Sequence, residues 1–228
     1  MLKLLHTVVR FMFPVPCVSC GYLGEALCSR CRDRLGFYPH VRSLEGLKVG
    51  SALYFEEGDL LERLIYPLKY SHQADVVRFL LPPLREALKL LLEPSQVILV
   101  PVPLHKKREL ERGYNQSELL AEGVGRAIGA PVLSLLRRVR ETESQVKVGG
   151  RVERLGNLAG AFEVLGRIPA GGQIVLVDDI VTTGSTLLAC AEALRAAGAE
   201  NIVALTLADR NEAPPTPWQR LPQTAAPA

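Results

Sequence analysis

The 228-residue sequence lacks an apolar run long enough to cross a membrane. A spanning helix needs about twenty consecutive apolar residues. The nearest candidate, residues 80–92, contains Pro82, Pro83 and charged residues, so it is predicted to be a surface helix with one buried stripe. The N-terminal stretch is also apolar, but Lys3 and Arg10 interrupt it and no A-x-A cleavage site follows. These absences argue against a membrane span and a signal peptide, and we expect a cytoplasmic protein.

A strong net charge and the common nucleotide-binding signatures are also absent. The net charge is only +3, so the overall charge does not by itself favour binding to nucleic acid or to a membrane surface. Neither a GxxxxGK[ST] loop nor a GxGxxG fingerprint occurs, and both nucleotide-binding classes therefore lack their own signal. The sequence has no internal repeat, and its histidines show no spacing typical of a ligand set. A chain of this length can form one α/β domain with a small additional segment.

A phosphate site is predicted from residues 174–187, IVLVDDIVTTGSTL. The four apolar residues at its start indicate a buried parallel strand, and the leucines and alanine that follow recur at helical spacing. The chain must therefore turn at residues 180–185 and present backbone N–H groups at a helix start, where no earlier carbonyl accepts from them. A glycine allows close approach of the backbone, and the hydroxyls can donate to phosphate oxygens. The predicted phosphate-binding residues are Thr182, Thr183, Gly184, Ser185 and Thr186.

Two carboxylates, Asp178 and Asp179, precede this turn. As anions they are unsuited to bind phosphate. At the carboxyl end of a strand, they are suited to accept hydrogen bonds from sugar hydroxyls or to lie beside a hydrated Mg²⁺. Together with the phosphate turn they predict a site for a ribose 5-phosphate group. The alternative is an ordinary strand-to-helix turn with an aspartate near a cap.

Four of the five cysteines form two CxxC pairs. Each pair presents two thiolates on a tight turn, and two such turns can close a tetrahedron around Zn²⁺. Four protein ligands leave no open coordination position, so the predicted zinc is structural. An iron–sulfur cluster or disulfide bonds are the alternatives. The predicted metal ligands are Cys17, Cys20, Cys28 and Cys31, whereas Cys190 is expected to be a small buried apolar residue.

A cluster of basic residues follows the strand predicted from residue 97. Such runs often face only solvent. This one, however, leaves a strand at its carboxyl end, where open α/β sheets bind ligands, so we predict that it holds a pyrophosphate group. Its residues, expected in a loop before a helix over residues 117–128, are Lys106, Lys107, Arg108 and Arg112.

Composition divides the chain into three parts. Residues 1–48 hold the CxxC pairs and seven Lys or Arg residues against three acidic ones. Residues 49–210 are predicted to form the α/β domain, with a further strand at 131–136 and a long loop at 139–152 that is expected to close over the site. Residues 211–228 are rich in proline and are predicted to be disordered.

The motif DDIVTTGST resembles the 5-phosphoribosyl 1-pyrophosphate (PRPP) loop of type I phosphoribosyltransferases. The resemblance implies that Asp178 and Asp179 face the ribose hydroxyls and that residues 182–186 hold the 5-phosphate. The order of parts, from the CxxC pairs through VPVPL and RGYNQ to DDIVTTGST, is similar to the ComF family of bacterial competence-related proteins. This similarity covers residues 5–208 and implies a mostly parallel sheet flanked by helices, with a small N-terminal zinc segment.

The resemblance implies a role in natural competence and DNA uptake, without naming an acceptor substrate. Three functions remain open. In a phosphoribosyltransferase, Asp178, Asp179, Arg108 and Arg112 would be catalytic, with Mg²⁺ and PRPP bound. In an accessory protein that binds single-stranded DNA without turnover, a basic track would follow the DNA backbone. In an assembly partner of other competence proteins, the phosphoribosyl site would be vestigial. The residues proposed for the track are Arg30, Arg32, Arg34, Arg42 and Lys48.

Overall fold

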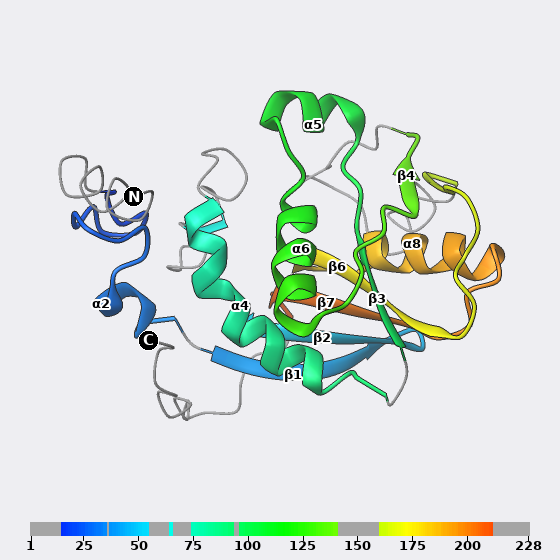
Figure 1. Ribbon diagram of the computed structural model, residues 1–228, viewed down its shortest axis with the longest axis horizontal. Coiled ribbons are helices and arrows are strands. Elements are labelled where there is room, and N and C mark those ends of the chain that lie inside the picture. The colour runs from blue at the N-terminus through cyan, green and yellow to red at the C-terminus, as the bar shows by residue number, and fades with distance from the viewer. Residues whose placement is uncertain are drawn as a thin grey trace.

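The computed structural model describes residues 15–35, 37–54, 64–65, 74–93, 96–140 and 160–211, which form a sheet with helices on both faces (Figure 1). The sheet has the order β1-β2-β7-β6-β3. The strands β2, β7, β6 and β3 run parallel, and β1 pairs antiparallel at the edge. The predicted fold class, a mostly parallel sheet flanked by helices, is therefore confirmed.

The strands of this sheet are β1 (Phe37–Leu44), β2 (Leu47–Tyr54), β3 (Gln96–Pro101), β6 (Gly172–Val181) and β7 (Ile202–Asp209). A separate antiparallel ribbon consists of β4 (Leu136–Arg138) and β5 (Phe162–Val164). The helices are α2 (Ser29–Arg32), α4 (Ala74–Lys89), α5 (Lys106–Arg112), α6 (Gln116–Ile128) and α8 (Ser185–Ala196).

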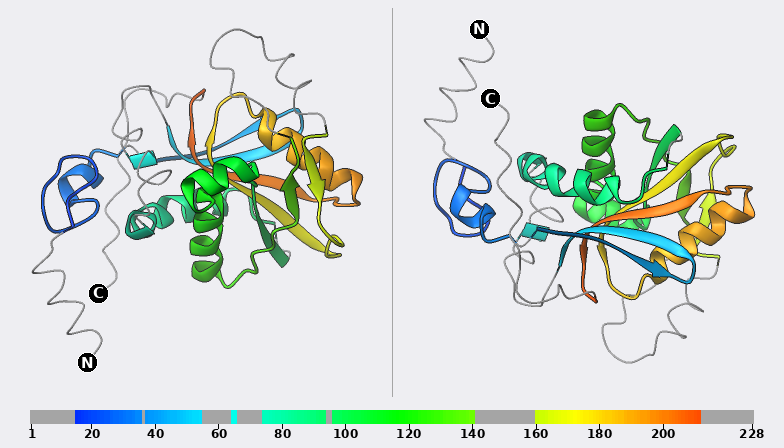
Figure 2. Two further views of the ribbon diagram at one scale, coloured as in Figure 1. Left: turned by 90° about the horizontal axis from the view of Figure 1, so that it is seen from above. Right: turned by 90° about the horizontal axis from the view of Figure 1, so that it is seen from below.

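Alternating side chains of the strands build one core on each face of the sheet. On one face, Val175 and Leu205 pack with α4 and α6. On the other, Leu176 and Ala204 pack with α8, where Cys190 is fully buried as predicted. Figure 2 shows the sheet between these helices. The apolar runs are continuous rather than alternating because both faces of the parallel strands are covered.

The hairpin of β1 and β2 crosses residue 48, where the sequence suggested a boundary between the N-terminal segment and the main domain. Its turn consists of Glu45 and Gly46, both with positive φ. Because β2 also pairs with β7, the hairpin is part of the five-stranded sheet. The sheet thus begins at Phe37, and the cysteine-containing segment is the part of the chain before it.

This cysteine-containing segment packs on the same side of the sheet as α4. Leu27 and Cys31 belong to one core cluster with Leu80 of α4. The guanidinium of Arg32 lies 5.7 Å from the ring centroid of Phe79, also in α4. In Figure 1 the segment, in blue, lies at the end of the molecule beyond α4. Apolar packing therefore attaches it to the main domain.

Two expected elements differ in the structure. The basic residues after β3 form the helix α5 and not a loop. Of the strand expected at 131–136, only Leu136 lies in a strand, at the start of β4, and Val132 makes an isolated bridge to Leu99. Most of the expected covering loop at 139–152, the N-terminal stretch 1–14 and the tail 212–228 lie outside the described residues. No helix within the described ranges is long and apolar enough to cross a membrane.

Candidate functional site

Two segments that are distant in the sequence meet at the carboxyl edge of the parallel strands. β6 ends in the two predicted carboxylates and the predicted phosphate turn, and β3 leads into α5 and α6. Figure 1 shows α5 beyond the end of β3. An open hollow of about 220 Å³ lies here, lined by Asp178 and residues 180–187. Its position is the one at which open α/β sheets bind ligands.

The phosphate turn ends in a helix start whose N-cap residue has no side chain; a long hydrogen bond of 3.5 Å joins the Ser185 N–H to Thr183 Oγ1. Gly184 is the N-cap residue of α8, has a φ of 80°, and offers no side-chain acceptor to the first turn. By contrast, His105 caps α5 and Asn115 caps α6. The hydroxyls of Thr183 and Ser185 are 2.6 Å apart and share a hydrogen bond. The first N–H groups of α8 and these hydroxyls therefore converge where an anion is favoured.

The turn is anchored through the backbone carbonyl of Thr182. This oxygen accepts a hydrogen bond from Arg42 Nη2 of β1 at 3.2 Å and another from the side-chain amide of Asn211. Arg42 Nε donates in turn to the buried carboxylate of Asp209 at the end of β7. The Arg42 side chain is only 13% exposed. Arg42 is thus occupied in holding the phosphate turn, so it drops out of the basic track expected for DNA.

Asp209 is the charged centre of this anchor. His40 Nε2 lies 3.5 Å from its carboxylate, and the backbone N–H of Asn211 donates to it at 2.9 Å. Burial alone would raise the pKa of Asp209, but the approach of His40, the hydrogen bond from Asn211 and the charge of Arg42 outweigh burial and lower it. The carboxylate therefore stays ionised and keeps its hold on Arg42.

The two predicted carboxylates are positioned by the start of α6. Ser117 Oγ donates to Asp178 Oδ1 at 3.0 Å, and Gln116 Nε2 donates to Asp179 Oδ2 at 3.2 Å. Both donors are neutral, so these bonds orient the carboxylates and leave their negative charge in place. Such a pair fits Mg²⁺ that keeps part of its water shell and is shared with phosphate oxygens.

Gln116 and Ser117 were not among the site residues expected from the sequence. They are 3% and 1% exposed, which is unusual for polar residues in the first turn of a helix. Gln116 stands in the RGYNQ motif, but the motif assigns it no partner. The available signal was the position of two polar residues immediately after a capping asparagine at a strand's carboxyl end.

The basic residues of α5 differ in their placement. Arg108 and Arg112 are half-buried, whereas Lys106 and Lys107 are exposed. Arg112 Nη1 donates to Gln116 Oε1 at 3.0 Å, and this bond ties α5 to the carboxylate region. The structure thus brings the two arginines toward the site and leaves the two lysines at its margin.

Arg138 in β4 is a further cation at this edge that the sequence did not single out. β4 forms a bridge to His105, the residue before α5. Burial, together with the nearby positive charge of Arg108, lowers the pKa of Arg138. Two guanidinium groups held close together form a natural anion site. The exposed neighbour Arg137 pairs with Glu163, so only alternation along the strand distinguishes the two arginines in the sequence.

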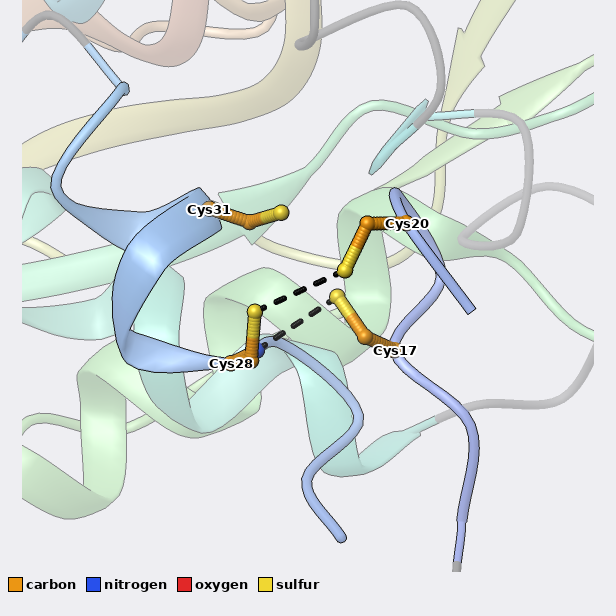
Figure 3. Close-up of side chains that lie close together, drawn as sticks. All are labelled: Cys17, Cys20, Cys28 and Cys31. Carbon is orange, nitrogen blue, oxygen red and sulfur yellow. Dashed lines mark hydrogen bonds between the residues drawn. The ribbon is translucent and has the colours of Figure 1, made fainter. Parts of the chain in front are cut away.

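The four predicted cysteine ligands converge on one point. Figure 3 shows their side chains turned toward one another from two separate turns. Their sulfur atoms all lie within 4.8 Å of one another, and Cys20 Sγ is 3.7 Å from Cys28 Sγ. Four Zn–S bonds of about 2.3 Å in a tetrahedron place the sulfurs about 3.8 Å apart. A disulfide needs about 2.05 Å, and all four thiols are free. The four cysteines are therefore positioned to bind a metal.

The pKa values of two of these thiols move in opposite directions. Burial raises the pKa of Cys17, but backbone N–H groups, that of Cys28 first, outweigh burial and lower it to about 6. At Cys31 the hydrogen bond from Ser19 lowers the pKa, but burial and the neighbouring thiols outweigh it and raise the pKa to about 12. A first thiolate thus opposes the next unless a cation is bound, which is typical of a metal site.

Comparisons with known proteins agree with the geometry at the carboxyl edge of the sheet. The phosphoribosyl transferase domain family matches residues 115–219. The chain is 29% identical over 192 residues to "Competence protein ComFC" of Bacillus subtilis, which covers 84% of this chain and 76% of that protein. It is 37% identical over 108 residues to "Competence protein F" of Haemophilus influenzae, 46% of each chain. It is 35% identical over 147 residues to "DNA utilization protein YhgH" of Escherichia coli K12, 61% of this chain and 63% of that one. The last two matches thus span less than two thirds of those relatives.

Proposed function

We propose that this chain, which is similar to competence proteins ComFC and F and matches the phosphoribosyl transferase domain family over residues 115–219, binds PRPP with Mg²⁺ in DNA uptake. The observation that carries the proposal is the start of α8 at Gly184, which follows Asp178 and Asp179 at the end of β6 across a short turn of hydroxyl residues. The names of the relatives, which refer to competence and DNA utilization, support the process. The four free thiols support a reducing compartment, the cytoplasm.

The parts of PRPP are assigned by charge. The 5-phosphate lies on residues 182–186, whose N–H and hydroxyl groups donate, and the ribose hydroxyls face Asp178 and Asp179. The pyrophosphate faces Arg108 and Arg112, with Arg138 beside them and Lys106 and Lys107 at the margin. Asp178 and Asp179 would hold Mg²⁺, which would supply charge neutralisation for the pyrophosphate.

The same arrangement supports phosphoribosyl transfer to an acceptor. When the bond between ribose C1 and pyrophosphate breaks, positive charge develops on the ribose and negative charge on the leaving group. The carboxylates face the first charge and the arginines the second, so electrostatic stabilisation can act without a nucleophilic side chain. Release of pyrophosphate in the presence of candidate acceptors, abolished by Asp178→Asn with Asp179→Asn, tests for turnover. Release retained by that variant would exclude this mechanism.

Calorimetric titration of PRPP into the metal-loaded protein, with and without Mg²⁺, tests the binding proposal. We expect binding that depends on Mg²⁺ and that Asp178→Asn with Asp179→Asn abolishes. Glu122→Gln is the matched control, because this exposed acid on α6 pairs only at the surface with Arg126. Absence of PRPP binding by the unaltered protein would overturn the proposal.

We assign Zn²⁺ to the four-cysteine cluster, with a structural role. The spacing of the sulfurs fits tetrahedral zinc, and four protein ligands leave no position for a substrate. Measurement of bound metal by mass spectrometry checks this assignment. If iron and inorganic sulfide are found in place of zinc, the site is an iron–sulfur cluster and the zinc assignment is wrong.

Binding of single-stranded DNA by the cysteine-containing segment is a second candidate. Tyr22 is 68% exposed, and Arg30 and Arg34 are exposed nearby in the chain, so the segment offers a stacking surface and exposed cations. We expect fluorescence anisotropy to detect binding that weakens with salt and with Arg30→Ala plus Arg34→Ala. Lys89→Ala, an exposed lysine of α4, is the control. Binding that is absent or independent of salt would remove this candidate.

A further inference from the structure

We propose that Gln116 is a positioning residue that couples the pyrophosphate-binding helix α5 to the ribose-binding carboxylate of Asp179. The inference rests on the PRPP site proposed above and adds a link within it. Pyrophosphate and ribose would otherwise be bound by separate elements, the first by α5 and the second by the end of β6.

The link is a continuous pair of hydrogen bonds through one side chain. Gln116 Oε1 accepts from Arg112 Nη1 at 3.0 Å, and Gln116 Nε2 donates to Asp179 Oδ2 at 3.2 Å. Gln116 is 3% exposed and Asp179 is 7% exposed, so water has little access to the second bond. In such surroundings a hydrogen-bonded chain transmits polarisation and displacement better than it does at a surface.

The backbone around Gln116 is fixed at the same point. Asn115 donates from Nδ2 to the carbonyl of Val102 at 3.0 Å and accepts from the N–H of Ser117 at 3.1 Å. The start of α6 is therefore tied to the end of β3, and the amide of Gln116 has little freedom to drift. A movement of Arg112 is consequently passed to the amide and not lost in the backbone.

An amide is the side chain that this position requires. It has an acceptor and a donor on one planar group, so it can receive an arginine N–H and give an N–H to a carboxylate at once. Because the amide is neutral, it links Arg112 to Asp179 without adding a charge between them. A carboxylate would repel Asp179, and an apolar side chain would interrupt the link.

The coupling predicts an effect of Arg112 on a ligand that it does not touch. Ribose 5-phosphate lacks the pyrophosphate, so in the proposed placement it contacts Asp179 and the turn at 182–186. If Gln116 transmits the position of Arg112, Arg112→Ala weakens the binding of ribose 5-phosphate. The loss of affinity should fall within the roughly 5- to 150-fold range typical of coupled sites. Gln116→Met weakens it similarly, and in that background Arg112→Ala has no further effect.

Titration of ribose 5-phosphate with Mg²⁺ into the full chain and into these variants tests the coupling. We expect a loss of about tenfold for each single variant and for the double variant alike. Arg126→Ala, an exposed arginine of α6, is the control and leaves the affinity unchanged. An unchanged affinity in Arg112→Ala, or an equal loss in both backgrounds, overturns the inference. Failure of the unaltered protein to bind ribose 5-phosphate and PRPP overturns the proposed function instead.

A second variant guards against misfolding of Gln116→Met. Gln116→Glu keeps the shape of the side chain but places a carboxylate against Asp179. We expect weak binding of ribose 5-phosphate near neutral pH that recovers as the pH is lowered, because protonation restores a donor toward Asp179. The affinity of the unaltered protein measured over the same pH range is the reference. A loss of affinity that does not depend on pH would mean that Gln116 only fills space.

Discussion

Substitution of Gly184 by alanine is expected to destabilise the fold by two separable effects. The residue has a φ of 80°, and the left-handed region costs a residue with a Cβ about 1–2 kcal/mol. A Cβ here would also lie 2.3 Å from Leu44 Cδ1. Leu44 is 3% exposed, so its methyl group must move within a packed core, at about 1–3 kcal/mol. The free energy of unfolding should therefore fall by about 2–5 kcal/mol.

Chemical denaturation of matched variants separates the two effects. Gly171 has a φ of 76°, and a Cβ added there would meet no atom within 4 Å, so Gly171→Ala carries only the conformational cost. Leu44→Ala removes the clashing methyl, and its combination with Gly184→Ala should be less destabilising than the sum of the two. Equal losses for Gly184→Ala and Gly171→Ala would refute the contact between the phosphate turn and β1.

Three further results are expected. Because hydrogen bonds and Arg42 lower the pKa of Asp209, its contribution to stability is complete above the ordinary pKa and is lost as the pH falls through the lowered one. Asp209→Asn should therefore lower the free energy of unfolding at pH 7, and the variant should lose less stability than the unaltered protein as the pH falls below about 4. Chemical denaturation across this pH range measures both curves, and parallel curves for the two proteins would contradict the prediction. Arg138→Ala should weaken pyrophosphate binding roughly tenfold, whereas Arg137→Ala, on the exposed side of β4, should not. Calorimetric titration of pyrophosphate measures both affinities, and equal effects would exclude Arg138 from the site. Removal of the metal with a chelator, or Cys31→Ser, should lower the melting temperature of the whole domain, because Cys31 shares a core with α4; an unchanged melting curve would show that the segment is energetically independent.

Local patterns in the sequence were sufficient for the phosphate turn and the cysteine cluster. The apolar run, the glycine and the hydroxyls of residues 174–187 lie within one strand, turn and helix, and the CxxC pairs lie within fifteen residues of chain. Each prediction depended on neighbours in sequence. The strand, turn and helix and the converging cysteines accordingly occur where they were expected, whereas phosphate binding by the turn stays a prediction.

The helix α5 shows a local signal that was available but not used. Its residues KKRELER are strong helix formers, His105 caps it, and Gly113 ends it with a φ of 76°. Because α5 has no buried residue, it lacks the apolar stripe from which helices were predicted. This helix is therefore defined by the residues at its two ends and not by an apolar periodicity.

The contacts that position the site could not be predicted from local patterns. Ser117 meets Asp178 across 61 residues of chain, and Arg42 meets Asp209 across 167. Periodicity identifies elements but not which side chains meet when a sheet closes. The same limitation explains the boundary near residue 48, since the pairing of β2 with β7 exists only in three dimensions.

The order of the strands has a consequence for how the chain is synthesised. β7 is the last strand of the described residues, yet it lies in the middle of the sheet, between β2 and β6. On the ribosome, the hairpin of β1 and β2 and the pair of β3 and β6 must wait as two fragments with open edges until residue 209 has emerged. Only then can Arg42 reach Asp209 and fix the phosphate turn. The nascent protein thus acquires its candidate site in a single late step, and until then its unpaired edges need protection from other chains.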